Sequence, residues 1–196
     1  ALGRVTLVRK KSEGKTGRLY ALKTMAKAHL ESEGRAMMMS AAMERDVLYA
    51  CNCDFIVRLR GSAQDRDCLY LLLDAAMGGE LFDRVTGKSA VKSRRGKLPL
   101  DEARFYICCV ILGIEHLHER GIVYRDLKSE NCLIDAKGYL TIADMGFCKK
   151  IDRGKTHTQR GTAEYLAPEV VTSSASLGGR GSTDSTGHGL AADVWS

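Results

Sequence analysis

The stretch YRDLKSEN, residues 124–131, holds an arginine, an aspartate, a lysine, a glutamate and an asparagine within eight positions. A solvated loop can carry such residues for no particular purpose. A site that handles a polyanion needs several of them together. The residues that lie at fixed distances on either side decide between these two interpretations.

Composition limits the kind of protein that surrounds this stretch. The chain has 196 residues, of which 44% are apolar and 28% are charged, with a net charge of +6. This balance is typical of a globular domain, either single or small and two-lobed. The seven cysteines form no CxxC pair, which favours reduced thiols and a cytosolic location, with the nucleus as a second compartment. The longest apolar run, Ile107 to Ile114, is too short to span a bilayer.

The first 74 residues predict a sheet with one helix. VTLVRKK (5–11) and GRLYALKTM (17–25) read as two strands of a hairpin. Residues 33–50 are helix formers throughout. FIVRLRG (55–61) and CLYLLLD (68–74) read as two further strands. A small and flexible stretch at 74–79 marks the predicted boundary to the rest of the chain.

The second part predicts mainly helix. Residues 98–121 follow a long helical pattern that ends at a glycine, and residues 131–144 read as a small hairpin. Two segments read as loops. Residues 84–97 hold six basic residues and no acid, which suits either a solvated face or an acidic partner. Residues 172–190 are rich in Gly, Ser and Thr and read as a disordered insertion.

Lys23 is the first candidate site residue. By the two-residue period of a strand it shares a face with Ala21, and a lysine on an inward face is costly unless an anion meets it. Glu44, on the predicted helix 33–50, could be that anion. Such a pair is also an everyday structural feature.

The opening stretch contributes a second group. Asp126, Lys128 and Asn131 are followed, after the predicted hairpin, by Asp144. The oxygens of Asn131 and Asp144 would converge across this ribbon and suit a hard cation such as Mg²⁺. Asp126 is then available to accept a proton from a hydroxyl nucleophile, and Lys128 could stabilise the negative charge that develops.

Two rival metal or nucleotide motifs fail. TGKS at 86–89 would end a P-loop only if position 82 were glycine, and it is Phe82. His116 and His118 are two residues apart on a helix and therefore face different sides, which argues against a zinc site.

Taken together, the motifs resemble the eukaryotic protein kinase family. They are Lys23 on a strand, Glu44 on the next helix, D-x-K-x-x-N at 126–131, DMG at 144–146 and APE at 167–169. YRDLK, GFCKK (146–150) and GTAEYLAPE (161–169) are similar to the AGC-like serine/threonine kinases, above all those that depend on cyclic nucleotides. The resemblance covers residues 1–196. It implies an α+β bilobal fold with lobes at 1–74 and 75–196, truncated at both ends.

The resemblance also implies site residues. The catalytic base is Asp126, assisted by Lys128 and Thr162, and these last two indicate serine or threonine rather than tyrosine substrates. The Mg²⁺ ligands are Asn131 and Asp144. The residues implied in ATP binding are Gly3, Val5, Ala21, Lys23, Glu44, Leu73, Asp74, Ala76, Glu80 and Leu133.

Substrate choice and regulation follow from the same resemblance. Glu80, Glu130 and Glu164 would favour basic residues before the target Ser or Thr. Thr158 matches the phosphorylated threonine of the activation segment, whose phosphate Arg125 and Lys149 would bind. The implied partners are protein substrates, an upstream activating kinase and a regulatory domain or subunit, with no nucleic acid and no membrane span.

Several departures keep a second reading open. The first two glycines of G-x-G-x-x-G are absent, and DMG stands where the family usually has DFG. Gln159 and Ala163 replace the apolar residue and the proline of the nearest relatives, so the preference for the residue after the target is undefined. The alternative function is a catalytically silent kinase fold that serves as a binding or scaffold module. The retention of Lys23, Glu44, Asp126, Asn131 and Asp144 favours an active enzyme.

Overall fold

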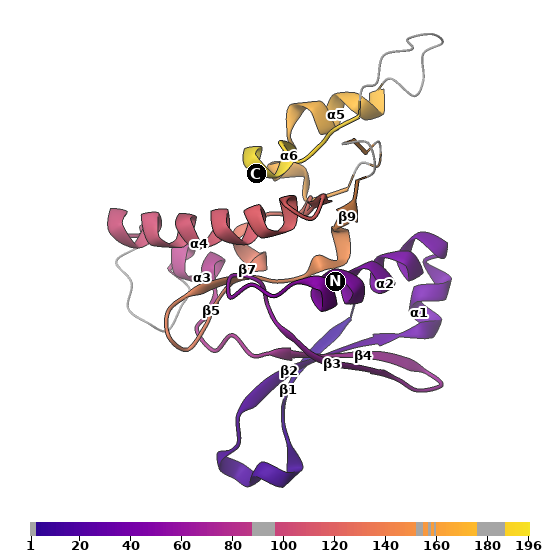
Figure 1. Cartoon of the computed structure of the whole chain (residues 1–196), viewed down its shortest axis with the longest axis vertical. Coiled ribbons are helices and arrows are strands. Elements are labelled where there is room, and N and C mark those ends of the chain that lie inside the picture. The colour runs from indigo at the N-terminus through magenta and orange to yellow at the C-terminus, as the bar shows by residue number, and fades with distance from the viewer. Residues whose placement is uncertain (1–2, 88–96, 152–154, 157, 159, 176–186) are drawn as a thin grey trace.

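The computed structural model describes residues 3–87, 97–151, 155–156, 158, 160–175 and 187–196. Within them the chain forms an antiparallel sheet with helices beside it, followed by a mainly helical region with short strands (Figure 1). The predicted α+β class is therefore confirmed. Most of the basic segment 84–97 and of the segment 172–190 lies outside the described residues. The lobe boundary at 74–79 stays a prediction.

The sheet has four strands in the order β1-β2-β4-β3. They are β1 (Arg4–Arg9), β2 (Leu19–Ala26), β3 (Leu59–Gln64) and β4 (Cys68–Asp74). The predicted hairpin is confirmed, and the 3-10 helix η1 (Lys11–Thr16) connects its strands. Lys23 lies in the second strand of the order, opposite Val5 on one side and Leu71 on the other.

The prediction for residues 55–61 is wrong in its first half. The strand begins at Leu59, because the apolar residues before it pair with the other part of the chain. Ile56 forms an isolated parallel bridge with Ile142, and the N–H of Val57 donates to the carbonyl oxygen of Ile142 at 2.9 Å. Both Ile56 and Val57 are buried. This segment therefore ties the sheet to the helical region instead of extending β3.

The predicted helix 33–50 is found as α2 (Arg35–Ala50). It begins after Gly34, whose φ of 91° favours glycine and separates it from the preceding turn. Its buried residues recur at helical spacing and place Glu44 on the inner face. A short helix that was not predicted, α1 (Lys27–Ser32), precedes it and buries Leu30 completely.

Two helices follow the sheet. The N-terminal end of the predicted basic loop is helical, because α3 (Leu81–Thr86) ends only at Gly87, which has a φ of 76°. The long predicted helix is confirmed as α4 (Leu100–His118), with Asp101 and Glu102 in its first turn. Gly121, with a φ of 66°, closes its C-terminal turn and donates its N–H to the carbonyl oxygen of His118.

The remaining elements are short. Residues 131–144 form the predicted hairpin, in a sheet ordered β5-β7-β8, while β6 pairs with β9. Helix α5 extends to Ala175, so the first residues of the predicted insertion are helical. The bounds are β5 (Gly79–Glu80), β6 (Ile122–Val123), η2 (Ser129–Asn131), β7 (Cys132–Ile134), β8 (Leu140–Ile142), η3 (Met145–Phe147), β9 (Lys149–Lys150), η5 (Ala163–Tyr165), α5 (Pro168–Ala175) and α6 (Ala192–Trp195).

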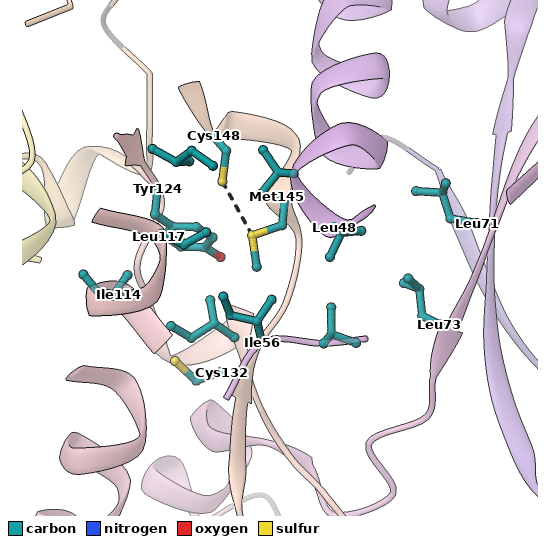
Figure 2. Close-up of a cluster of buried hydrophobic side chains, with 14 of the residues drawn as sticks. Leu48, Ile56, Leu71, Leu73, Ile114, Leu117, Tyr124, Cys132, Met145 and Cys148 are labelled. Atoms are coloured by element: carbon teal, nitrogen blue, oxygen red, sulfur yellow. Dashed lines mark hydrogen bonds between the residues drawn. The ribbon is translucent and has the colours of Figure 1, made fainter. Parts of the chain in front are cut away.

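One hydrophobic cluster joins the sheet to the helical region (Figure 2). Met145 of the DMG motif is completely buried in it, together with Leu48 of α2 and Tyr124. The thiol of Cys148 lies 3.5 Å from the thioether sulfur of Met145. Methionine thus occupies the phenylalanine position of DFG as an apolar filler.

No helix in the described part of the chain is long and apolar enough to cross a membrane.

Candidate active site

A buried ionic triad lies between the sheet and the helical region. The Lys23 ammonium contacts Glu44 Oε1 at 2.6 Å and Asp144 Oδ1 at 3.0 Å. Lys23 and Glu44 are almost fully buried, whereas the Asp144 side chain is 32% exposed. The pair predicted from the strand and helix patterns therefore exists, and a third member comes from the DMG motif.

Burial perturbs both partners of the inner pair. Burial raises the pKa of Glu44, and the Lys23 charge opposes this shift only in part. For Lys23, burial works against the charged form, but the two carboxylates outweigh it and raise its pKa above 10.5. The lysine therefore stays protonated and keeps its positive charge beside the partly exposed Asp144.

Two further bonds orient the DMG segment. Asp144 has a φ of 57°, in the left-handed region, and accepts a bond from the N–H of Gly146. The Ser40 hydroxyl of α2 donates to the carbonyl oxygen of Gly146. Helix α2 therefore positions both Glu44 and the segment that carries Asp144.

Asp126 is the centre of a second polar group. Its carboxylate accepts bonds from Asn131 Nδ2 at 2.8 Å and from Thr162 Oγ1 at 2.7 Å, and it contacts the Lys128 ammonium at 3.0 Å. Lys128 also donates to Thr162 Oγ1 at 2.7 Å. The structure therefore brings Asp126 together with Lys128 and Thr162, which the resemblance implies in catalysis, and with Asn131, an implied Mg²⁺ ligand. Thr162 comes from 36 positions away.

The Asn131 side chain is fixed by Asp126, and its main chain bonds the segment that carries Asp144. Its nitrogen donates both to the carboxylate and to the main-chain carbonyl oxygen of Asp126, each at 2.8 Å. Its own main-chain carbonyl accepts from the N–H of Ala143, the residue before Asp144. With the nitrogen so engaged, the amide oxygen is the atom that Asn131 can offer to a cation.

Asp193 of α6 supports the loop that carries Asp126. Its carboxylate accepts the main-chain N–H groups of Tyr124 at 2.8 Å and Arg125 at 2.7 Å, and it contacts His118 Nε2 at 2.8 Å. Arg125 has a φ of 73°, so these two bonds stabilise a strained conformation. The contact with His118 could not be predicted from the sequence, because the two residues lie 75 positions apart.

The residues implied in nucleotide binding are arranged around the sheet. Strand register places Ala21 opposite Leu73, and Val5 opposite Lys23. Glu80 pairs with Leu133 between β5 and β7. A Cβ at Gly3 would lie 2.4 Å from the carbonyl oxygen of Thr24, so only glycine lets the chain approach β2 this closely.

Asp74 is engaged more fully than the sequence suggested. Its carboxylate forms a two-pronged ion pair with Arg60, at 2.7 and 2.6 Å, and a further one with Arg18. Its N–H donates to the carbonyl oxygen of Arg58, so this group is not free for a nucleotide. A cavity of about 780 Å³ adjoins Asp74 and Ala76, and Lys23, Asp126 and Asp144 are not among its lining residues.

The three acids expected at the substrate site come from separate segments. Glu80 is exposed, directly before α3, and α3 packs against the turn η2 that contains Glu130. The Ser129 hydroxyl donates to Glu130 Oε2 at 3.1 Å. Glu164 is exposed in η5, which directly follows Thr162. Glu80 and Glu130 are thus brought to neighbouring elements, whereas Glu164 lies two positions after Thr162, which bonds Asp126.

The regulatory residues predicted from the sequence also meet. Lys149 Nζ donates to the Thr158 hydroxyl at 3.2 Å and to the Thr156 hydroxyl at 2.8 Å. Arg125 donates to the carbonyl oxygen of Thr158 at 3.3 Å. Thr158 is exposed. The hydroxyl thus lies at the surface, against cationic side chains.

Comparison with known proteins agrees with this geometry. Residues 2–196 match the family described as Protein kinase domain. The chain is 38% identical over 196 residues to the cGMP-dependent protein kinase, isozyme 2 forms cD5/T2, of Drosophila melanogaster, covering 99% of this chain and 18% of that protein. It is 38% identical over 198 residues to human ribosomal protein S6 kinase alpha-1, covering 100% of this chain and 24% of that protein. The chain thus spans less than a quarter of the length of these relatives.

Proposed function

This chain belongs to the protein kinase family, and from this premise we propose that it transfers the γ-phosphoryl group of ATP to Ser and Thr hydroxyls of protein substrates. The observation that carries the proposal is the pair of polar groups built around Lys23 and Asp126. In the first group Lys23 contacts Glu44 and Asp144. In the second, Asp126 contacts Lys128, Asn131 and Thr162. We expect Lys23 to hold the phosphates of the nucleotide and Asp126 to receive the substrate proton.

The donor atoms present fit Mg²⁺-ATP. Asp144 offers a partly exposed carboxylate and Asn131 an amide oxygen, both of which are hard ligands that suit Mg²⁺. When bound, Mg²⁺-ATP supplies the phosphoryl group and neutralises part of its charge. Lys23 is held by Glu44 and Asp144, so its positive charge lies next to the proposed metal ligand Asp144.

Asp126 has the capacity that a general base requires. A carboxylate offers about four lone-pair positions, and Asn131, Thr162 and Lys128 occupy three of them. The remaining position can accept the proton of a Ser or Thr hydroxyl as its oxygen attacks phosphorus. Lys128 lies beside this position and can offset the charge that develops.

Substrate choice and regulation form the finer part of the proposal. The contact of Lys128 with Thr162 supports Ser and Thr substrates, and the acids Glu80, Glu130 and Glu164 support basic residues before the target. The position of Thr158 between Arg125 and Lys149 supports activation by phosphorylation. Similarity to cGMP-dependent kinases supports a regulatory domain or subunit in the whole protein.

Exchange of Asp126 for Asn tests the transfer role. The amide keeps the shape but no longer accepts the proton, so phosphorylation of an Arg-containing serine peptide should fall below detection while nucleotide affinity stays within about twofold. Asp101→Asn is the matched control, because the Asp101 side chain is 97% exposed on α4. Transfer by Asp126→Asn at the wild-type rate would disprove the role.

The alternative is a kinase fold without catalysis, suggested by the DMG sequence. Complete burial of Met145 in the hydrophobic cluster argues against a disrupted site. The alternative predicts that wild-type protein binds nucleotide yet transfers no phosphate to any peptide. Restoring phenylalanine with Met145→Phe separates the cases, because only an enzyme impaired at this position would gain activity.

A further inference from the structure

Arg160 lies in the same region as the two cations assigned to Thr158. Its guanidinium carbon is 5.9 Å from the centre of the Phe147 ring. The carbonyl oxygen of Phe147 accepts a bond from Arg125 Nε at 2.7 Å. Two guanidinium groups therefore flank one phenylalanine, and one of them also reaches the carbonyl oxygen of Thr158.

The three cations repel one another across this region. Burial lowers the pKa of Arg125, and the charge of Arg160 lowers it further. Burial likewise lowers the pKa of Lys149, with an added contribution from Arg125. Asp193 is a carboxylate that acts favourably on Arg125, but its oxygens already accept two main-chain N–H groups and contact His118.

Thr156 fixes the position of Lys149 beside Thr158. Thr156 is 1% exposed, and its main chain pairs with that of His188 through bonds of 2.8 and 2.9 Å. The hydroxyl of Thr156 accepts the bond from Lys149 that places this ammonium beside Thr158. Lys149 is therefore held near Arg125 although the two charges repel, an arrangement that an added anion would stabilise.

We propose that Arg160 is a third cationic ligand for a phosphate on Thr158, beside Arg125 and Lys149. This inference rests on the proposed function and names a positioning residue that the sequence motifs did not assign. A phosphate has three acceptor oxygens, and three donors from different directions match them. Arg160 follows Thr158 by two positions, and its charge already acts on Arg125, which bonds the carbonyl oxygen of Thr158.

The test is the ionisation of that phosphate in the full chain with phosphothreonine incorporated at position 158. Nearby cations favour the doubly charged form, so the second pKa of the phosphate, about 6 when unperturbed, should be lowered in the wild type. A ³¹P NMR titration measures it directly. Arg160→Gln should raise this pKa towards the unperturbed value, and Arg160→Lys should restore much of the effect.

A second measurement is the rate of dephosphorylation by an added phosphatase, which should rise about tenfold in Arg160→Gln because one charge-assisted contact is lost. Lys150→Gln is the matched control, since Lys150 is exposed beside Lys149 on β9. If Arg125→Gln shifts both measurements and Arg160→Gln shifts neither, the inference is wrong and the proposed function stands. If neither variant shifts them, the regulatory role of Thr158 fails as well.

Discussion

The region around Lys23 and the region around Thr158 solve the problem of buried or crowded charge in opposite ways. Lys23 meets two carboxylates within 3.0 Å, so its charge is balanced by the protein itself. Around Thr158, Arg125, Lys149 and Arg160 lie together without a matching set of carboxylates among the described residues. In the first region carboxylates of the protein itself balance the lysine, and the second region is arranged for an anion that must be added.

The largest expected effect comes from removing the lysine of the balanced region. Lys23→Met leaves Glu44 buried without its cation, and such a loss costs about 3–5 kcal/mol in the free energy of unfolding. Phosphate transfer should fall by roughly 10²–10³-fold, because a positioned cation is lost from the nucleotide site. Urea unfolding and peptide phosphorylation measure the two effects.

The exposed Lys150 provides the control for this change. Lys150→Met removes an equal charge from β9 and should alter the free energy of unfolding by less than about 0.5 kcal/mol. Should Lys23→Met prove as mild as Lys150→Met, the description of a balanced buried triad would be wrong.

A smaller effect is expected among the acids assigned to substrate binding, Glu80, Glu130 and Glu164, which are negative where the region around Thr158 is positive. Glu130→Gln should lower kcat/KM by about tenfold for a serine peptide with arginine before the target, since one charge pair is lost. For a peptide with alanine in place of that arginine, the variant and the wild type should have the same kcat/KM. Steady-state kinetics with both peptides tests this, and equal losses for both peptides would assign Glu130 a structural role instead.

The balanced region was easier to predict from the sequence than the unbalanced one. Lys23 lies on a segment with a clear strand period, which gives its inward face, and Glu44 lies on a run of helix formers that follows it. Asp126, Lys128 and Asn131 lie within six positions of one another. Local patterns of this kind identify both the elements and the residues that they present.

Pairings across long sequence distances could not be read in the same way. The main-chain bridge of Thr156 with His188 joins the segment after β9 to the C-terminal end of the Gly-, Ser- and Thr-rich stretch 172–190. Ile56 lies in a run that reads as a strand, yet it pairs with Ile142 because the apolar cluster between the two parts of the chain buries both. In each case tertiary burial, and not local propensity, selected the partner.

A modest effect is expected when a carboxylate is introduced into the unbalanced region. Thr158→Glu supplies one negative charge where a phosphate would supply nearly two, so it should stabilise the fold by less than about 1 kcal/mol at low salt. Thermal unfolding should show the gain shrinking as ionic strength rises, because exposed charges are screened. A gain that is independent of salt would mean that packing, and not charge, is responsible.

The smallest effects concern pH, where a buried and an exposed carboxylate should act in opposite directions. Burial raises the pKa of Glu44 above 4.5, so its contribution to stability is present below pH 4.5 and is lost as pH rises through the raised value. Asp65 accepts bonds from the Tyr70 hydroxyl and from two main-chain N–H groups, which lower its pKa below 3.8. Its contribution is present above pH 3.8 and is lost as pH falls through the lowered value.

The free energy of unfolding, measured from about pH 3 to 7, tests both shifts. Its decline at high pH should disappear in Glu44→Gln, and its decline at low pH should disappear in Asp65→Asn. Parallel pH profiles for the two variants would contradict the contrast, because the pKa of Glu44 is raised and that of Asp65 is lowered.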